Sequence, residues 1–408
     1  MTAPNGSIVF NASTGSDTQS SGLGPSAAVY GSGASTTGSS AVVTGIDTTG
    51  VSAGDLLWVQ SSSGRQFSII ASVDSSTQVT CDDQFANTES SRIWAIGGKR
   101  ATWDNSDSVK IFTADAKSDW DIVTETDQTI TQQITLCLGC ISIRGIENGA
   151  LPVIEQTSNN TLFQNGQNQS VVFHSLNFKY SHPTKDKVGF YFGYGQAVFV
   201  NVVANDPNKN WSTFAARACC NPAGFRFYSC IIGNCASTGV SASQGGGVFV
   251  DSIFHNNGSD GVYVGGWSGT AIGCIFANNA RHGLYMANTN AYFGHNIFMS
   301  NGEYGIAFAP FAQGSVGVVT SNYFYNNTLG RTNQGTTGVN RVLESPSDII
   351  LTSDPFIDSA NQDYNFKDNA FINKTYWLGS DTTAYPFRKF VSSYFQTTNN
   401  TMKTHPLA

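Results

Sequence analysis

The sequence predicts an all-β protein whose central part is a parallel β-helix, a solenoid of short strands in stacked coils. A six-residue phrase recurs at a spacing of 22 residues, a glycine returns in the same register, and a short apolar strand follows the glycine. A repeat in the twenties that is built from short strands is typical of a solenoid. The phrases span residues 230–235, 252–257, 274–279 and 296–301, and the glycines are Gly239, Gly261, Gly283 and Gly305.

The composition agrees with a turn-rich β protein. Charged residues make up 12 % of the 408 residues, about half the share in an average soluble protein, and 42 residues are glycine. The net charge is −7 and no run of Lys or Arg stands out, so a nucleic-acid partner is not expected. No apolar run approaches the roughly 18 residues of a membrane span, so membrane insertion is not expected. Residues 1–7 lack the features of a signal peptide, so we expect a protein that is either made and kept in the cytosol or released by lysis.

The repeat assigns residues to columns that run along the solenoid. Ile231, Ile253, Ile275 and Ile297 are expected to form one inward column, and Ile232, Phe254, Phe276 and Phe298 occupy the next register. Adjacent strand residues face opposite sides, so we expect one column to lie at a bend or under a neighbouring chain. The asparagines at residues 256–257 and 278–279 mark a turn, where Asn tolerates left-handed backbone and stacked amides bond from coil to coil. The recurring glycine indicates positive φ.

The eight cysteines are not expected to form a disulfide framework in a chain of this length without a signal peptide. Cys230 and Cys274 share a repeat position with Ser252 and Asn296, which indicates a ladder of small side chains. Cys137 and Cys140 have metal-type spacing, but no second pair lies nearby, so we expect a structural pair, no metal and no cofactor.

Four regions follow from the change of pattern along the chain. Residues 1–40 are rich in Ser, Gly and Thr and predict an extended arm that orders only on a partner surface. Residues 41–130 alternate in short strands, which predicts a small N-terminal β domain and a cap for the solenoid. Residues 131–345 hold the β-helix, and residues 346–408 predict a β-rich C-terminal extension that packs along the helix flank or on a neighbouring subunit.

Three segments carry a resemblance to known families. Residues 296–308, Asn-Ile-Phe-Met-Ser-Asn-Gly-Glu-Tyr-Gly-Ile-Ala-Phe, resemble the right-handed parallel β-helix families of the pectate-lyase-like group, which implies a right-handed, single-stranded parallel β-helix. Residues 64–70 through 94–102, and residues 353–357, resemble the flanks of uncharacterised β-helix proteins encoded in phage and environmental bacterial genomes. This resemblance implies a virion surface protein, namely a tailspike, a tail fibre or a capsid decoration.

The same resemblance implies a location on the virion surface and several partners. Phage β-helices of this type usually form trimers, so a homotrimer is expected. The N-terminal region would bind other virion proteins, and host surface polysaccharide is a further candidate partner.

Two neighbouring columns carry groups able to do chemistry. Asp260, His282 and Tyr304 share one, and the other holds Ser259, Arg281 and Glu303. Asp260 and Glu303 are two coils apart, on the order of 10 Å, close to the carboxylate separation of an inverting glycosidase. Asp260, Glu303 and His282 are therefore the candidate catalytic residues. Because these positions precede a strand, the alternative that they are solvated turn residues is favoured. The few carboxylates in any one column disfavour a calcium-dependent lyase.

Aromatic residues near these columns suggest a place for sugar rings. Tyr263 and Tyr285 share a column, Trp267 lies in the adjoining turn, and Arg281 is close by. Aromatic faces hold sugars by stacking, although packing against a sister chain explains them equally well and is favoured. His255, which aligns with Ala277 and Met299, is expected to be an ordinary surface residue.

The sequence thus predicts a phage virion structural protein that acts by assembly and by attachment to host-surface glycans. The alternative is a tailspike depolymerase that hydrolyses a cell-surface polysaccharide, and a bacterial adhesin is a weaker third possibility.

Overall fold

The computed structural model describes residues 7–62, 64–103, 120–135, 140–146, 150–165, 170–184, 186–193, 196–206, 208, 211–217, 224–243, 245–266, 268–287, 290–309, 316–333, 341–344 and 346–367. The chain divides into two units, the first comprising Met1–Ile130 and Thr135–Ile146, the second Thr131–Ile134 and Glu147–Ala408. Within the described residues, no helix is long and apolar enough to cross a membrane.

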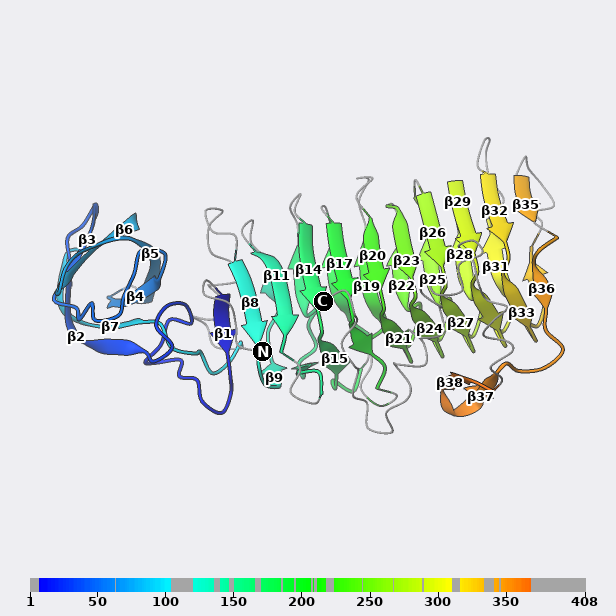
Figure 1. Ribbon diagram of the computed structural model, residues 1–408, viewed down its shortest axis with the longest axis horizontal. Coiled ribbons are helices and arrows are strands. Elements are labelled where there is room, and N and C mark those ends of the chain that lie inside the picture. Colours follow the sequence, from blue (N-terminus) through cyan, green and yellow to red (C-terminus); the bar gives the residue numbers. More distant parts are fainter. Residues whose placement is uncertain are drawn as a thin grey trace, which may run out of the picture. The chain divides into compact units, whose positions relative to one another are not determined.

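The first unit contains a closed antiparallel barrel with the strand order β2-β3-β6-β5-β4-β7, blue in Figure 1. Its core includes Leu57, Val59, Ile70, Val79 and Trp94. A closed barrel leaves no strand edge exposed. The strands are β2 (Val29–Thr36), β3 (Ser40–Thr44), β4 (Leu56–Ser61), β5 (Gly64–Ser75), β6 (Gln78–Phe85) and β7 (Glu89–Ile96). The predicted small β domain is therefore a barrel, and it begins before residue 41.

The N-terminal residues differ from the predicted arm. β1 (Ser7–Phe10) pairs in parallel with β8 (Trp120–Thr124), which pairs with β11 (Cys140–Gly145); β9 (Gln128–Ile130) follows β8. Ile8 and Phe10 are completely buried. The Ser/Gly/Thr-rich composition concealed these two apolar anchors, so the expectation that residues 1–40 order only on a partner is wrong for the described part of this segment.

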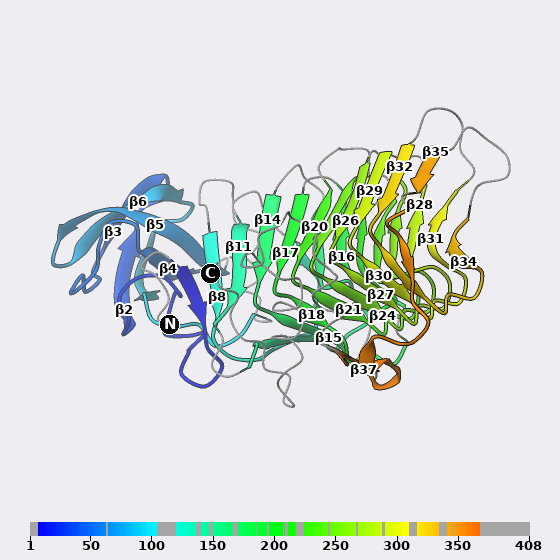
Figure 2. The ribbon, with the colours of Figure 1, turned by 45° about the vertical axis from the view of Figure 1, so that its right-hand side comes forward.

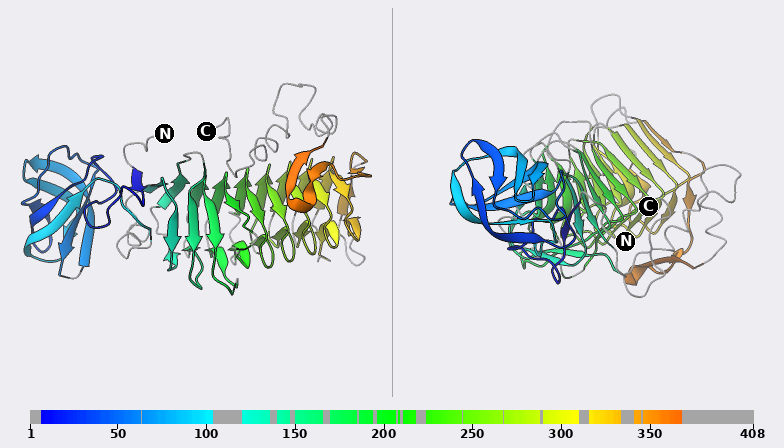
Figure 3. Two further views of the ribbon diagram at one scale, coloured as in Figure 1. Left: turned by 90° about the horizontal axis from the view of Figure 1, so that it is seen from below. Right: turned by 60° about the vertical axis from the view of Figure 1, so that its left-hand side comes forward.

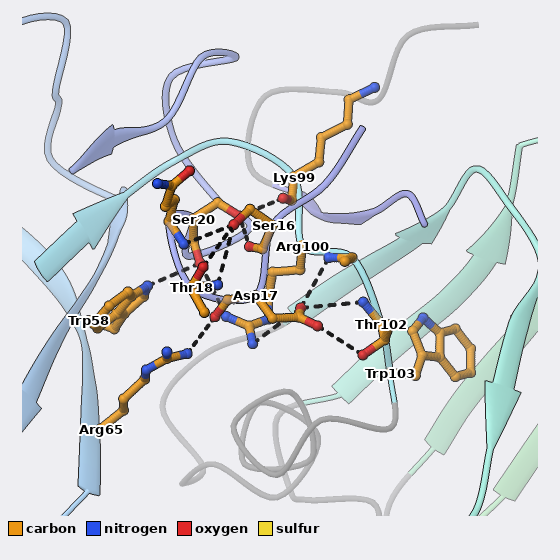
Figure 4. Close-up of polar contacts among 12 residues, drawn as sticks. Ser16, Asp17, Thr18, Ser20, Trp58, Arg65, Lys99, Arg100, Thr102 and Trp103 are labelled. Atoms are coloured by element: carbon orange, nitrogen blue, oxygen red, sulfur yellow. Dashed lines mark hydrogen bonds and ion pairs between the residues drawn. The ribbon is translucent and has the colours of Figure 1, made fainter. Parts of the chain in front are cut away.

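A buried polar network fixes residues 16–20 to residues 99–102 (Figure 4). Asp17 Oδ1 accepts hydrogen bonds from the backbone N–H groups of Ala101 (3.0 Å) and Thr102 (3.3 Å). Arg100 is completely buried, with Nη2 3.5 Å from Asp17 Oδ1, and its Nη1 donates to the carbonyl of Ser20 at 3.1 Å. A charged side chain is tolerated at such depth because it is paired and hydrogen-bonded.

The second unit is a parallel β-helix in which successive coils add strands to three sheets (Figures 1 and 2). The first sheet has, in order, β14 (Ser170–His174), β17 (Gln196–Val200), β20 (Phe225–Tyr228), β23 (Gly247–Val250), β26 (Ser268–Ile272), β29 (Asn290–Gly294), β32 (Val316–Thr320) and β35 (Arg341–Glu344). The second has β12 (Val153–Gln156), β15 (Asn177–Tyr180), β18 (Val203–Ala204), β21 (Ile231–Gly233), β24 (Ile253–His255), β27 (Ile275–Ala277), β30 (Ile297–Met299), β33 (Tyr323–Tyr325) and β36 (Ile349–Ile350).

The third sheet carries the candidate site. It has β13 (Phe163–Asn165), β16 (Val188–Phe192), β19 (Thr213–Arg217), β22 (Val240–Ala242), β25 (Val262–Val264), β28 (Leu284–Met286), β31 (Tyr304–Phe308) and β34 (Gly330–Thr332), and β10 (Ile134–Thr135) falls where the two units divide. Strand partners lie 22 residues apart in the regular coils, as Val240 with Val262 and Val262 with Leu284 show. The predicted all-β parallel β-helix is confirmed.

Phenylalanine rings fill the interior. Phe254, Phe276, Phe298 and Phe324 form an inward column of the second sheet, with successive ring centroids 5.3, 4.8 and 5.3 Å apart and nearly parallel planes. The sequence predicts the isoleucine column inside the solenoid; the structure instead places Phe254, Phe276 and Phe298 inside, and because adjacent strand residues face opposite sides the isoleucines point outward. Stacked aromatic rings of this kind contribute about 0.5–1.5 kcal/mol per pair beyond the area that they bury.

A ladder of buried asparagine side chains locks the register from coil to coil, as predicted. Asn257 donates from its backbone N–H (3.2 Å) and from Nδ2 (2.9 Å) to Oδ1 of Asn279. Asn279 repeats both bonds to Asn301, and Asn301 repeats them to Asn327. The position shared by Cys230, Ser252, Cys274 and Asn296 forms a second ladder, in which the Cys274 N–H donates to Asn296 Oδ1 at 2.9 Å. Both cysteines are buried and free, so this ladder is not a disulfide bridge.

The turn conformation follows the prediction for asparagine but not for glycine. Asn256 and Asn278 are left-handed, with φ of 51° and 55°. The repeated glycines do not have positive φ; instead, a Cβ added to Gly261 would lie 2.6 Å from the carbonyl oxygen of Gly283. Glycine is required here because the backbones of consecutive coils approach closely.

The outward isoleucine column is covered by the same chain. β37 (Phe356–Asp358), the short 3-10 helix η1 (Ser359–Asn361) and β38 (Asp363–Phe366) form a small hairpin, orange in Figure 3. Phe356 and Tyr364 of this hairpin are completely buried in one apolar cluster with Ile231, Ile253, Ile275 and Ile297. The C-terminal extension therefore packs along the solenoid, as predicted for its described part.

The hairpin also explains the burial of His255. This residue is 1 % exposed, and its ring lies edge-on to Tyr364, with centroids 5.4 Å apart. Its Nδ1 has no hydrogen-bond partner among the residues that the structure describes. The expectation of an ordinary surface histidine is wrong, because the residues that cover it come from more than 100 positions later in the chain.

Removing one amide from the ladder should destabilise the solenoid. Asn279 Nδ2 also donates to the carbonyl of Phe254 at 3.1 Å, so Asn279→Leu leaves several buried polar groups unpaired. We expect a loss of about 3 kcal/mol or more, because each such group costs about 1–3 kcal/mol. The neighbouring Asn256→Gly should cost less than about 1 kcal/mol, since glycine adopts the left-handed turn. Chemical denaturation measures both, and equal losses would contradict this role of the ladder.

Acid should weaken the second unit through His255. Burial lowers the pKa of His255 to about 3, so the folded chain holds the neutral ring. Below the ordinary pKa of about 6.5, the unfolded chain binds a proton on this histidine whereas the folded chain does not. The free energy of unfolding therefore falls as the pH drops from about 6.5 toward 3, by up to about 1.4 kcal/mol per pH unit. His255→Met should flatten the dependence of unfolding free energy on pH between 7 and 4.5, since Met299 occupies the same column. An unchanged slope would contradict it.

Candidate functional site

The predicted site residues lie where the chain enters the third sheet, in three consecutive coils. Backbone hydrogen bonds confirm their columns: the Gly261 N–H donates to the carbonyl of His282 (2.9 Å), and the Glu303 N–H donates to the carbonyl of Arg281 (2.7 Å). The 22-residue register therefore brings Asp260, Arg281, His282 and Glu303 together. With Tyr263, Tyr285 and Tyr304 they form what we call the Arg281 cluster.

Asp260 is a buried ion-pair partner. Its side chain is 1 % exposed, whereas the Arg281 side chain is 41 % exposed. Arg281 Nε donates to Asp260 Oδ1 at 2.9 Å, and Arg281 Nη2 bonds to Oδ2. The backbone N–H of His282 also donates to Asp260 Oδ1, at 3.2 Å. The interpretation of Asp260 as a solvated turn residue is wrong, because the arginine of the next coil reaches back and covers it.

The ion pair with Arg281 affects the catalytic role predicted for Asp260. Both carboxylate oxygens of Asp260 are engaged by Arg281, and these hydrogen bonds raise the pKa of Arg281 further above its ordinary value. A bidentate arginine–carboxylate pair fixes both groups in one geometry. Asp260 is thus placed to position Arg281, while proton transfer to a substrate would require the pair to break.

His282 lies next to both the buried Asp260 and the partly exposed Glu303. It is 5 % exposed, and its Nδ1 accepts a hydrogen bond from the Tyr304 N–H at 3.3 Å. The ring proton is therefore assigned to Nε2, which lies 3.4 Å from Glu303 Oε2. Burial lowers the pKa of His282, although Asp260 and Glu303 act in the opposite direction. Burial thus favours the neutral ring, which lies beside Glu303, whose side chain is 42 % exposed.

Aromatic rings form a continuous row across the cluster. The rings of Tyr263 and Tyr285 stack with centroids 5.4 Å apart and planes 14° apart. The His282 ring stacks on Tyr285 (5.4 Å, 11°) and on Tyr304 (5.9 Å, 28°). Arg281 Cζ lies 4.9 Å from the centre of the Tyr285 ring, a cation–π contact. Trp267, the other predicted sugar-binding residue, lies outside the described residues.

The sequence columns did not reveal the pairing of Asp260 with Arg281. The available signal was their separation of 21 residues, one short of the coil length, with opposite charges at neighbouring positions. The long side chain of Arg281 spans this diagonal, with Nε 2.9 Å from Asp260 Oδ1. The cluster therefore offers aromatic rings, a partly exposed guanidinium and a partly exposed carboxylate, a set suited to holding a sugar rather than to the paired carboxylate chemistry of a glycosidase.

Comparison with known proteins supports the fold. Residues 216–340 match a family model described as right handed beta helix region. The chain resembles a mutant of the periplasmic alginate epimerase AlgG (11 % identity, TM-score 0.41, 58 % of this chain and 64 % of that chain) and the unmutated enzyme (11 %, 0.37, 61 % and 65 %). It also resembles the catalytic domain of a GH87 alpha-1,3-glucanase in complex with nigerose (10 %, 0.27, 80 % and 89 %). No curated protein matches the chain.

These similarities concern the fold alone. The chain spans just under two thirds of the length of the alginate epimerase structures. The fold is a right-handed parallel β-helix, in agreement with the family model that matches residues 216–340. Because one fold hosts many functions, the function must be argued from the site.

A substitution at Asp260 distinguishes a structural from a catalytic carboxylate. Asp260→Asn weakens a buried pair, and we expect a loss of about 1–3 kcal/mol in unfolding free energy. Glu303→Gln, at a partly exposed carboxylate, should cost less than about 1 kcal/mol. Denaturation of both variants measures the difference. A fully stable Asp260→Asn protein would contradict the structural role and return Asp260 to the catalytic candidates.

Proposed function

We propose that the Arg281 cluster binds a glycan, and that the chain is a phage virion surface protein that attaches to host-surface carbohydrate. The observation that supports binding is the row formed by Tyr263, Tyr285 and His282, with the guanidinium of Arg281 against Tyr285. Rigid aromatic faces beside a polar group are the usual means of holding a sugar ring, whose own faces are partly apolar.

The cluster favours binding over hydrolysis. Asp260 is engaged by Arg281, which leaves Glu303 as the more accessible of the two predicted catalytic carboxylates. An inverting glycosidase needs a free acid and a free base on opposite sides of the bond that it cleaves. The depolymerase alternative would therefore require the ion pair to open when substrate binds.

The virion role rests on the resemblance of the flanking segments to phage-encoded β-helix proteins. In this proposal the N-terminal region binds other virion proteins, and the solenoids assemble as a homotrimer. Three sites on one particle protein would raise the apparent affinity for a repetitive polysaccharide without any new contact. Mass spectrometry of purified particles should detect the chain, and its absence there would overturn the virion assignment while leaving glycan binding open.

Truncation of the aromatic row should abolish binding. Tyr285→Ala removes the ring that contacts Tyr263, His282 and Arg281, and we expect binding to immobilised bacterial lipopolysaccharides and capsular polysaccharides to fall about tenfold or more. Tyr292→Ala is the matched control, because Tyr292 is an exposed tyrosine of the first sheet. Surface plasmon resonance measures both proteins.

The same polysaccharides serve as a test of catalysis. After incubation with the wild-type protein, no new reducing ends or unsaturated uronates are expected. If such products appear with the wild-type protein and are absent with the Glu303→Gln variant, depolymerase activity would replace attachment as the function. Failure of the wild-type protein to bind any polysaccharide of the panel would overturn the proposed glycan site.

A further inference from the structure

The outward residues of the third sheet form one continuous column through the Arg281 cluster. Strand register places Tyr191, Ala216, Ser241, Tyr263, Tyr285 and Ala307 in successive coils. The residues beside them, such as Val240, Val262 and Leu284, are completely buried and face the core. The column therefore changes from two small side chains to two stacked tyrosines at the step from Ser241 to Tyr263.

The rings in this column differ in the faces that they leave open. Tyr285 is covered by Tyr263 on the side of the preceding coil, and it also contacts His282 and Arg281. Ala307, which follows Tyr285 in the column, is completely buried. Because Tyr263 stacks on Tyr285 with nearly parallel planes, its opposite face is directed along the solenoid toward Ser241.

The backbone is shaped to seat Tyr263 in this position. A Cβ added to Gly265 would lie 2.9 Å from the hydroxyl oxygen of Tyr263 and 2.3 Å from the carbonyl oxygen of Ser243. Glycine at position 265 therefore leaves room for the tyrosine to lie along its own strand. A ring held in this way does not have to be ordered when a ligand arrives, which favours binding.

On the side of Tyr263 that faces Ser241, the described residues of the column have small side chains, and Tyr285 is the ring that stacks on Tyr263 among the described residues. Ser241 and Ala216 are both partly exposed and carry the smallest side chains of this part of the column. Coils are about 4.8 Å apart, so Tyr191, three coils from Tyr263, lies roughly 14 Å away. A ring that stacks on Tyr263 at the usual distance of about 4.5–5 Å would therefore lie at the level of Ser241.

We propose that one neutral hexopyranose residue of the glycan stacks on the open face of Tyr263, above Ser241 and Ala216. This assignment rests on the proposed glycan-binding function and gives it a subsite and a sugar class. The stacked sugar presents a face of axial C–H groups, as glucose- and galactose-type rings do, and the Ser241 hydroxyl is available to its equatorial hydroxyls as donor or acceptor. Neither Ser241 nor Ala216 carries a charge that would pair with the carboxylate of a uronic acid, and we assign the position to a neutral ring for this reason.

Filling the subsite with protein tests the assignment. Ser241→Tyr extends the tyrosine stack by one coil and occupies the volume assigned to the sugar. We expect polysaccharide binding to fall at least about tenfold with an unchanged melting temperature, because tyrosine already occupies this column in the next two coils. Thr270→Tyr is the matched control: it places a tyrosine beside Tyr292 in the outward column of the first sheet and should leave binding unchanged.

The outcomes separate the subsite from the function on which it rests. If the wild-type protein and Ser241→Tyr bind polysaccharide equally, or if the variant binds more tightly, the subsite is wrong while glycan binding stands. If the wild-type protein binds none of the polysaccharides, the proposed function itself fails. Methyl β-D-glucopyranoside or methyl β-D-galactopyranoside should compete with the polysaccharide at millimolar concentration; competition by uronic acids alone would overturn the assignment to neutral sugars.

Discussion

The register between coils is the constraint on which the rest of this β-helix depends. A slip by one residue would turn every inward side chain outward, so burial of the inner face already opposes it. The Asn257–Asn279–Asn301–Asn327 ladder resists it specifically, because each buried amide bonds to the same group one coil on. An amide out of register would leave buried donors and acceptors unpaired, at a cost far above that of displaced methyl groups.

A fixed register turns single residues into surface columns. Asp260 binds Arg281 because Arg281 directly precedes His282, the residue that aligns with Asp260 in the next coil. Tyr263 stacks on Tyr285 because both occupy the same position in consecutive coils. The ladder and the candidate site are thus parts of one arrangement. Rigid coils hold the aromatic row in place before a ligand binds, so little ordering entropy is lost on binding.

The sequence predicted what depends on the repeat itself. The two apolar columns, the amide ladder and the left-handed Asn256 follow from local chemistry at a fixed period, and the ladder and Asn256 are confirmed. Which column faces inward did not follow from the period: the isoleucines were expected inside, but the Phe254 column is there. The burial of His255 could not be read in this way, because Tyr364 covers it from outside the repeat. The repeated Gly261 was assigned to turn conformation, whereas it is required by the close carbonyl of Gly283, an inter-coil distance that a sequence does not state.

The candidate site also has features that the sequence alone could not predict. Alignment of columns brought Asp260, Arg281, His282 and Glu303 together, but it could not say which carboxylate faces water. That depends on the reach of one arginine side chain, which covers Asp260 and leaves Glu303 partly exposed. The difference bears on the chemistry: two free carboxylates beside a sugar suit cleavage, whereas one carboxylate bound to an arginine and one beside a histidine suit a fixed binding surface. Attachment rather than turnover is the function that this division of roles favours.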